Sequence, residues 1–280
     1  MMKLSLCNEV LRALSFEEQC RLASALRYDG LEVAPFTLSA EPASVPASER
    51  RRLRQMAADH GLEITGLHWL LTAPEGLSLT SDDAAVAART RDHMLAMVEL
   101  CADLGGSVLV HGSPGQRQLR DAASPEHARD IAMAHLAAAA DAAAHAGVLY
   151  CIEPLAPSMD DFVNTVAEAV KLVETIGSPG FATMFDTYAA VGGEAEPAEA
   201  VLDRFLPGGH VRHIHFNDRS KRGPGLGADR FAPIVDCLVR HDYDGVIAVE
   251  PFDYYPDGPG VAAFAAGYVR GLLEMRKECS

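Results

Sequence analysis

The feature that most constrains the fold of this chain is a set of four apolar runs. Each run carries one side chain of a metal-binding type at or next to its end: Glu153, Asp186, His215 and Glu250. They follow one another at intervals of about 30 to 35 residues, the length of one strand-helix-strand unit. Because the carboxyl ends of parallel barrel strands converge on one mouth, where such enzymes hold their reacting groups, the spacing predicts that the four side chains face one another.

A divalent cation is the expected partner of this set. Three carboxylates in one place repel one another unless a cation lies among them. Oxygen donors mixed with one imidazole suit Mn²⁺, Mg²⁺ or Co²⁺ better than a thiolate site would, and Zn²⁺ is a further candidate. The alternative for any one carboxylate is that it caps the following helix or forms half of a salt bridge. A proline directly follows Glu153 and Glu250, which argues against the cap role for these two because the chain there stays extended.

The whole sequence alternates between strand-like and helix-like segments. Predicted strands cover residues 3–7, 30–33, 62–68, 107–111, 148–155, 181–186, 211–216 and 245–250, and predicted helices include residues 15–28, 48–60, 83–104, 124–147, 165–177, 197–206 and 259–275. This strict alternation predicts an α/β fold, a closed (β/α)8 TIM barrel, with an open parallel sheet as the alternative. Nothing in the composition marks a second domain, so we expect residues 1–280 to form one barrel.

Composition limits the partners and the compartment. A hydrophobic content of 49% supports a large core, while a net charge of −15 disfavours nucleic acid, whose binding needs Lys and Arg to neutralise phosphates. The sequence shows no secretory signal and no apolar run of membrane-spanning length, which predicts a cytoplasmic protein that does not bind a membrane. Six scattered cysteines without a CxxC pair are expected to be reduced thiols: Cys7, Cys20, Cys101, Cys151, Cys237 and Cys279.

Two loops are candidates for contacts with a substrate. The first, residues 69–82, could fold over the barrel mouth as a lid, and its Trp69 could stack on a sugar face or pack in the core. The second follows the seventh strand and is rich in glycine and basic residues; Arg222 within it could face the site, or the loop could be a solvated turn.

Short motifs along most of the chain resemble the xylose isomerase-like TIM-barrel superfamily, the sugar phosphate isomerase/epimerase group that includes ketose 3-epimerases. The motifs are Tyr28–Glu32, Gly66–His68, Val110–Ser113, Ile152–Pro154, Phe185–Tyr188, His213–His215, Arg222–Gly225 and Val249–Phe252. The resemblance implies a single divalent metal site at Glu153, Asp186, His215 and Glu250, with the two glutamates as the acid/base pair. One departure concerns Ala189, where the epimerases have a histidine that helps bind the substrate.

The expected reaction is isomerisation or epimerisation of a keto-sugar, a sugar phosphate or a related polyol ketone. A metal that bridges two oxygens of an α-hydroxy ketone acidifies the neighbouring C–H and stabilises the enediolate, while one Glu takes a proton and a second returns it. Loss of a β-hydroxyl would instead make the protein a dehydratase that resembles inosose dehydratase. An endonuclease IV-like metal nuclease and a non-catalytic sugar-binding barrel are further alternatives; homodimers or homotetramers are candidate assemblies.

Other polar residues near strand ends could have either a functional or a structural role. His68 and His111 could contact substrate or hold a second metal, as equivalent histidines do in the related endonuclease IV, or could be hydrogen-bonded wall residues. Glu32 could orient a metal-bound histidine or a substrate hydroxyl, or form a buried ion pair. His213 is expected to pack inward, one layer below His215.

Overall fold

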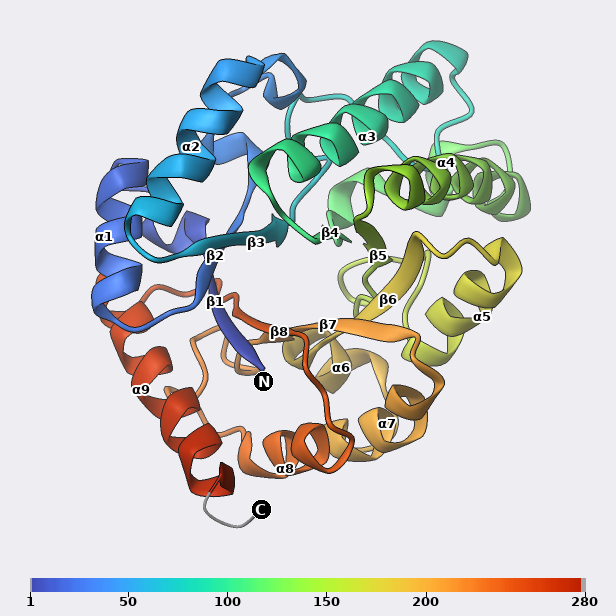
Figure 1. The fold of residues 1–280 in the computed structure, drawn as a ribbon. Coiled ribbons are helices and arrows are strands. Elements are labelled where there is room, and N and C mark those ends of the chain that lie inside the picture. Colours follow the sequence, from blue (N-terminus) through green and yellow to red (C-terminus); the bar gives the residue numbers. More distant parts are fainter. Residues whose placement is uncertain (1, 278–280) are drawn as a thin grey trace.

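The computed structural model of the chain describes residues 2–277 and forms a closed barrel of eight parallel strands surrounded by helices (Figure 1). The strands are β1 (Lys3–Cys7), β2 (Gly30–Val33), β3 (Glu63–Leu67), β4 (Val108–His111), β5 (Leu149–Ile152), β6 (Phe181–Asp186), β7 (Val211–Phe216) and β8 (Val246–Val249). The first strand pairs with both the second and the last, which closes the ring. The predicted α/β barrel is therefore confirmed.

The helices lie outside the strands, as Figure 1 shows. They are α1 (Phe16–Ala25), α2 (Ala47–Asp59), α3 (Ala84–Leu104), α4 (Pro125–Ala146), α5 (Val166–Ile176), α6 (Thr187–Gly193), α7 (Ala198–Phe205), α8 (Ala232–Arg240) and α9 (Gly258–Lys277). Most of the apolar core lies between strands and helices, because alternate strand side chains point outward toward the helices.

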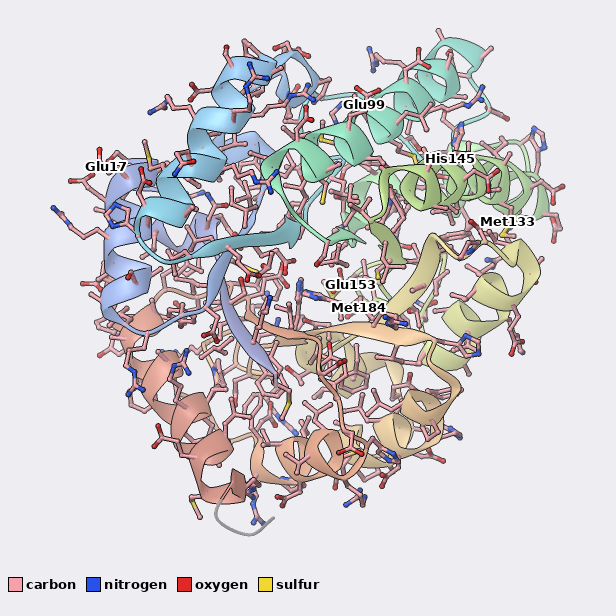
Figure 2. The ribbon with its side chains drawn as sticks, viewed as in Figure 1. Glu17, Glu99, Met133, His145, Glu153 and Met184 are labelled. Atoms are coloured by element: carbon pink, nitrogen blue, oxygen red, sulfur yellow. The ribbon has the colours of Figure 1, made fainter. Side chains whose placement is uncertain are left out.

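The interior of the barrel is filled by the opposite set of strand side chains. Beneath the mouth lies a small apolar cluster that includes Cys151 and Met184. Each of these residues precedes a ligand-type residue by two positions, so Glu153 and Asp186 stand one layer above them. Figure 2 shows Glu153 and Met184 in the centre of the ring, whereas Glu17 and Glu99 lie at the periphery.

Helix starts follow the capping signals in the sequence. Ser15 and Glu18 form a complete capping box at the start of α1. At α5 the sequence Thr165-Val-Ala-Glu168 has the capping-box pattern, but the box is only half formed: Thr165 accepts the backbone N–H of Glu168, while the Glu168 carboxylate accepts from the backbone of Asn164. The first helix also ends at Ala25, three residues earlier than predicted.

Two further features differ from the sequence prediction. The short helix α6 directly follows β6, where none was expected, and Asp186 is its N-cap residue. Residues 69–82 do not form a lid: Trp69 lines the mouth, but Leu70, Leu71 and Leu79 are buried. Hydrogen bonds from His93 on α3 and His135 on α4 to carbonyls of this loop fix it against those helices.

The described residues support the predicted state of the cysteines. Cys7, Cys20, Cys101, Cys151 and Cys237 are free and buried, and Cys279 lies outside the described residues. Within residues 2–277, no helix has both the length and the apolar character needed to cross a lipid bilayer. The exact limits of the domain, residues 1–280, stay a prediction.

Candidate active site

The four predicted ligand residues come together at the mouth of the barrel. Glu153, Asp186, His215 and Glu250 each offer one donor atom, and these atoms all lie within 4.8 Å of one another. Their exposed fractions are 6%, 3%, 0% and 4%. The convergence predicted from strand spacing is therefore present, in a setting nearly closed to bulk water.

Glu153 is held at the end of β5 by His111 on β4 and by Arg117 in the segment after β4. Its backbone N–H donates to the carbonyl of His111, and its own carbonyl accepts a 2.8 Å hydrogen bond from the fully buried guanidinium of Arg117. The carboxylate lies directly over Gly112: a Cβ atom added there would stand 1.6 Å from Glu153 Oε2. The absence of a side chain at residue 112 thus creates the space for this carboxylate.

Asp186 has a structural role as well as its place in the cluster. Its Oδ1 accepts the backbone N–H of Ala189 at 2.6 Å, which caps α6, and its Oδ2 accepts from Asn217 Nδ2 at 2.9 Å. The same Asn217 amide donates to the carbonyl of Glu250 at 3.0 Å. The helix-cap reading is therefore correct for Asp186, but a carboxylate has about four lone-pair sites, so two hydrogen bonds leave room for a cation.

His215 is oriented from below by Glu32. The Nε2 atom of His215 lies 2.9 Å from Glu32 Oε1, and Nε2 of His213 lies 2.8 Å from the other oxygen. If Nε2 of His215 carries the proton and donates it to Glu32, Nδ1 keeps a lone pair that can bind a metal ion. This Nδ1 atom lies 3.0 Å from Glu250 Oε2. A carboxylate that fixes the tautomer of a metal-binding imidazole is a common arrangement.

The buried carboxylates of the cluster repel one another, and this repulsion shifts their pKa values. Burial and the nearby charges of Glu250 and Asp186 raise the pKa of Glu153 well above its ordinary value. Burial and Glu250 also raise the pKa of Asp186 to about 7. Burial lowers the pKa of His215, but Glu250 and Glu32 outweigh it and raise that pKa well above normal. A divalent cation would relieve this repulsion, and three carboxylates with one imidazole are suitable ligands.

A small pocket lies above the cluster, with an aromatic wall on one side. Trp69 and Phe252 line it, and their rings meet edge to face with centroids 6.4 Å apart. Tyr188 also meets Phe252 edge to face, with centroids 5.5 Å apart. Glu153 and Glu250 line the floor. The lining of this pocket therefore combines aromatic rings with two carboxylates.

The structure places His68 and Glu32 below this pocket or at its edge. His68 lines the pocket, and its Nε2 lies 2.9 Å from Glu9 Oε2. Glu32 is fully buried and its carboxylate is engaged by imidazoles. Its geometry favours the orienting role over contact with a substrate hydroxyl.

Two predicted substrate contacts are corrected. His111 is fully buried, its Nδ1 lies 2.7 Å from the hydroxyl of Tyr150, and Tyr150 belongs to the core between strands and helices. The side chain of His111 therefore points away from the mouth; burial lowers its pKa to about 3, so it stays neutral. Arg222 does not line the mouth pocket, because its Nε pairs with Asp253 at 3.1 Å and its guanidinium stacks on Tyr255.

Three residues of the candidate site were not predicted: Glu9, Asn217 and Phe252. Asn217 and Phe252 each follow a ligand residue by two positions, so side-chain alternation carries them to the same mouth. Glu9 likewise follows the inward residue Cys7 by two positions, on the 3-10 turn Asn8–Leu11. The sequence could have indicated these residues, because the alternation of inward and outward side chains continues just beyond the end of each strand.

Comparison with known proteins agrees with this geometry. A family model described as "Xylose isomerase-like TIM barrel" matches residues 20–272. The chain belongs to this family. Within the family, D-psicose 3-epimerase of Agrobacterium fabrum is 28% identical over 236 residues, 81% of this chain and 76% of that protein. The ketose 3-epimerase of Arthrobacter globiformis is 24% identical over 235 residues, 82% of this chain and 78% of that protein.

A solved structure of an L-ribulose 3-epimerase superposes with a TM-score of 0.85, covering 100% of this chain and 97% of that one at 23% identity. At this identity the match establishes the shared fold alone. Family membership and its epimerase relatives indicate an enzyme of the sugar isomerase or epimerase kind, and the buried histidine and carboxylate cluster is consistent with a metal site.

Proposed function

We propose that this protein is a divalent-metal-dependent epimerase or isomerase of a ketose. One observation carries the proposal: Glu153 and Glu250 offer carboxylate oxygens within 4.8 Å of each other and of two further metal-type donors, at the floor of a pocket with an aromatic wall. The ketose 3-epimerase relatives support the choice of substrate class.

Glu153, Asp186, His215 and Glu250 are the residues that would hold the cation, through His215 Nδ1 and one oxygen of each carboxylate. When bound, a divalent ion would polarise the ketone and stabilise negative charge on its oxygen. Mn²⁺, Mg²⁺ and Co²⁺ are the proposed ions, with Zn²⁺ as a fourth candidate.

The proton transfers belong to the two glutamates. One carboxylate removes the proton from the carbon next to the ketone, and the other returns a proton to the opposite face, which inverts that carbon. Return of the proton to the adjacent carbon would give an aldose instead. Burial and the nearby carboxylates of Glu250 and Asp186 raise the pKa of Glu153, which suits a group that must accept and return a proton.

The surroundings favour a neutral sugar over a phosphorylated one. Arg219 and Arg222, in the loop after β7, are both already paired, with Asp229 and Asp253 respectively. A phosphate would have to compete with these carboxylates. Trp69 and Phe252 instead present apolar ring surface of the kind that packs on the C–H face of a sugar.

A dehydratase on the same scaffold is the second candidate, because it would share every ligand and differ only in loss of a β-hydroxyl. An endonuclease IV-like nuclease is disfavoured by the corrected position of His111 and by the net charge of −15. A non-catalytic sugar-binding barrel would keep the cluster only as structure.

Solvent isotope exchange tests the proposal. The protein, loaded with Mn²⁺, is incubated in deuterated water with a panel of unphosphorylated ketoses, and products are analysed by mass spectrometry and chromatography. We expect gain of one deuterium and a new sugar of otherwise unchanged mass; loss of water would favour the dehydratase. No deuterium incorporation into any ketose would overturn the proposal.

Variants make the assignment specific. Glu153→Gln and Glu250→Gln are each expected to slow exchange by about 10² to 10⁴, the usual contribution of a general acid or base. Glu99→Gln is the matched control, because Glu99 is exposed on α3 at the periphery (Figure 2). A Glu250→Gln variant with wild-type activity would favour the non-catalytic barrel.

The cytoplasmic location and the homodimeric or homotetrameric assembly stay predictions. Size-exclusion chromatography with light scattering measures the assembly.

A further inference from the structure

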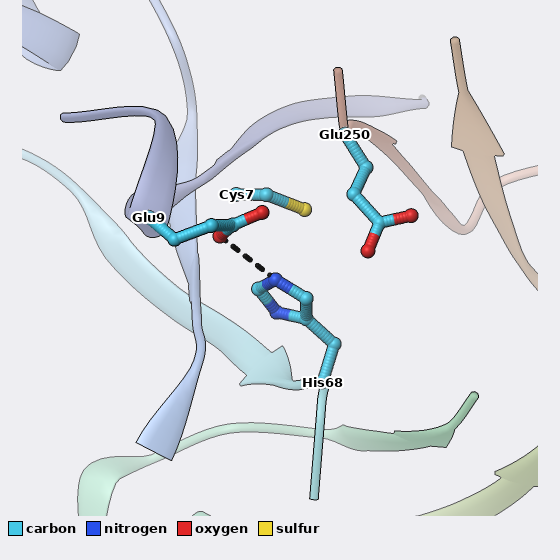
Figure 3. Close-up of side chains that lie close together, drawn as sticks. All are labelled: Cys7, Glu9, His68 and Glu250. Carbon is cyan, nitrogen blue, oxygen red and sulfur yellow. Dashed lines mark hydrogen bonds and ion pairs between the residues drawn. The ribbon is translucent and has the colours of Figure 1, made fainter. Parts of the chain in front are cut away.

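A second group of metal-type donors lies beside the proposed centre and shares one residue with it. Cys7, Glu9, His68 and Glu250 each offer one donor atom, all within 4.8 Å of one another, and all four residues are buried (Figure 3). Cys7 ends β1, Glu9 follows on the 3-10 turn, and His68 follows β3. The two groups therefore share the Glu250 carboxylate.

The geometry points to a second, thiolate-containing cation site formed by Cys7, Glu9, His68 and Glu250, so that Glu250 bridges two cations. This inference extends the proposed metal centre, since it uses one of that centre's ligands. A thiolate and an imidazole are softer ligands than carboxylates, so the class of ion expected here is Zn²⁺ or Co²⁺, not Mg²⁺.

The orientation of the imidazoles supports this assignment. Glu32 lies between His68 and His215, with its Oε1 3.7 Å from His68 Nδ1 and 2.9 Å from His215 Nε2. One buried carboxylate therefore faces one nitrogen of each ring. The other nitrogen of His68, Nε2, lies beside Glu9, and the other nitrogen of His215, Nδ1, lies beside Glu250. Each ring therefore presents one nitrogen to the group of ligands to which we assign it.

The thiol of Cys7 also lies within 4.8 Å of donor atoms of Glu32 and His215, but those two side chains already pair with each other. The Cys7 thiol is fully buried and free, and within residues 2–277 it takes part in no hydrogen bond. Figure 3 shows its sulfur atom directed into the space bounded by Glu9, His68 and Glu250. A buried thiol beside carboxylates keeps its proton, and a bound cation would displace that proton as the thiolate becomes a ligand.

Charge balance supplies an independent argument. Five carboxylates of the described residues are buried around the mouth, on Glu9, Glu32, Glu153, Asp186 and Glu250. One divalent ion balances two of these five charges and leaves three within a low-dielectric region. A second ion beside Glu9 would add two positive charges against the one negative charge of the Cys7 thiolate, so the unbalanced negative charges would fall from three to two. The competing explanation is a protonated His68 between Glu9 and Glu32.

Cobalt binding distinguishes these explanations. The full chain is stripped with a chelator, reloaded anaerobically with CoCl₂, and examined for bound cobalt by elemental analysis and for near-ultraviolet sulfur-to-cobalt charge-transfer absorption. We expect two cobalt ions per chain together with the charge-transfer absorption. Cys7→Ser should abolish the absorption and leave one cobalt per chain, while Asp186→Asn should weaken the other site and keep the absorption.

A control addresses the surface group formed by Asp203, Cys237 and His241, which could bind cobalt through a different thiol. The Cys237→Ser variant should retain both the second cobalt and the absorption. If Cys7→Ser does not fold, as judged by circular dichroism, Glu9→Gln replaces it and should lower the affinity for the second cobalt by at least about tenfold, the usual minimum cost of losing even a residue that only supports a metal ligand.

The possible failures are distinct. One cobalt per chain without charge-transfer absorption would overturn the second site, leave the proposed centre intact and favour the protonated His68. Two cobalt ions without absorption, or absorption lost in Cys237→Ser, would also overturn it. No bound cobalt in the wild-type protein would contradict the second site and the proposed metal centre together.

Discussion

At the scale of single residues, Glu32 organises the buried polar layer. Its carboxylate lies 2.8 Å from His213 and 2.9 Å from His215, and burial, which would raise its pKa, is outweighed by these imidazoles, which hold that pKa well below normal. Glu32 therefore stays ionised and fixes the orientation of His215. The proposed ligands stand on a prearranged layer, which lowers the cost of ordering them when a cation binds.

Proton release on metal binding is the first prediction. Burial and Glu250 raise the pKa of Asp186 to about 7, and burial with Glu250 and Asp186 raises the pKa of Glu153. Without a metal ion, the cluster therefore holds protons near neutral pH. Because a cation must displace them, its affinity should rise with pH between about 6 and about 8. Calorimetric titration with Mn²⁺ in buffers of different ionisation enthalpy counts the protons; an affinity that does not change over this range would contradict the prediction.

The ligand residues could be predicted from sequence because each stands at the end of an apolar run. The pairings beneath them could not. Glu32 and His215 are neighbours only because the barrel closes, and no local pattern links two residues so far apart in the chain. The prediction for His111 was wrong for a related reason. Neighbouring residues of a strand point in opposite directions, and His111 points toward the helix-facing core and not into the barrel.

At the scale of elements, the segment after β4 determines the place of Glu153. The second prediction concerns Gly112, where a Cβ atom would stand 1.6 Å from Glu153 Oε2. Gly112→Ala should displace the carboxylate and lower both Mn²⁺ affinity and isotope exchange by about tenfold or more. Gly115→Ala, three residues along, is the matched control because no atom lies within 4 Å of its added Cβ. Equal behaviour of the two variants would refute the argument.

The third prediction concerns Arg117, which ties this segment to the one after β5. Its fully buried guanidinium donates to the carbonyls of Glu153 and Val163, and its Nε lies 3.2 Å from Asp160. Arg117→Met would leave a buried carboxylate without its partner and should lower the free energy of unfolding by about 3–5 kcal/mol.

Urea denaturation measures this loss. Arg120→Met, a change at an exposed position nearby, should stay within about 0.5 kcal/mol of wild type. The addition of Asp160→Asn to Arg117→Met should recover part of the loss, because it removes the unpaired charge. A similar loss of unfolding free energy in Arg117→Met and Arg120→Met would show that the buried pair of Arg117 and Asp160 does not stabilise the fold more than an exposed arginine does.

Element boundaries were predictable where caps and glycines mark them, as at Ser15 and Gly105. The helix α6 was missed because its seven residues are too few to show a helical period and end in two glycines. Its start depends on Asp186, which serves as cap and cluster member at once. The sequence offered these two roles as alternatives, while the structure combines them.

At the scale of the whole molecule, the proposed ligands come from consecutive strands of the second half, and Glu32, His68 and Glu9 come from the first half. The site therefore requires the closed ring. The fold itself was predictable because the alternation is repeated along the entire chain, so errors at single boundaries do not change the topology. The mouth was less predictable because loops without periodicity build its rim.

The fourth prediction is that metal binding stabilises the whole barrel. A ligand that binds only the folded state, present at about 100 times its Kd, adds about 2.7 kcal/mol to the free energy of unfolding. Differential scanning calorimetry with increasing Mn²⁺ should show a Tm that rises with concentration. Asp186→Asn should lose most of this rise, and an equal rise in that variant would place the binding elsewhere.

The most direct test of the central claim is the position of Mn²⁺ in crystals of the metal-loaded protein, measured by anomalous diffraction at the manganese edge. We predict a strong anomalous peak bounded by Glu153, Asp186, Glu250 and Nδ1 of His215. Crystals grown at saturating Mn²⁺ that show no peak among these four side chains would contradict the account.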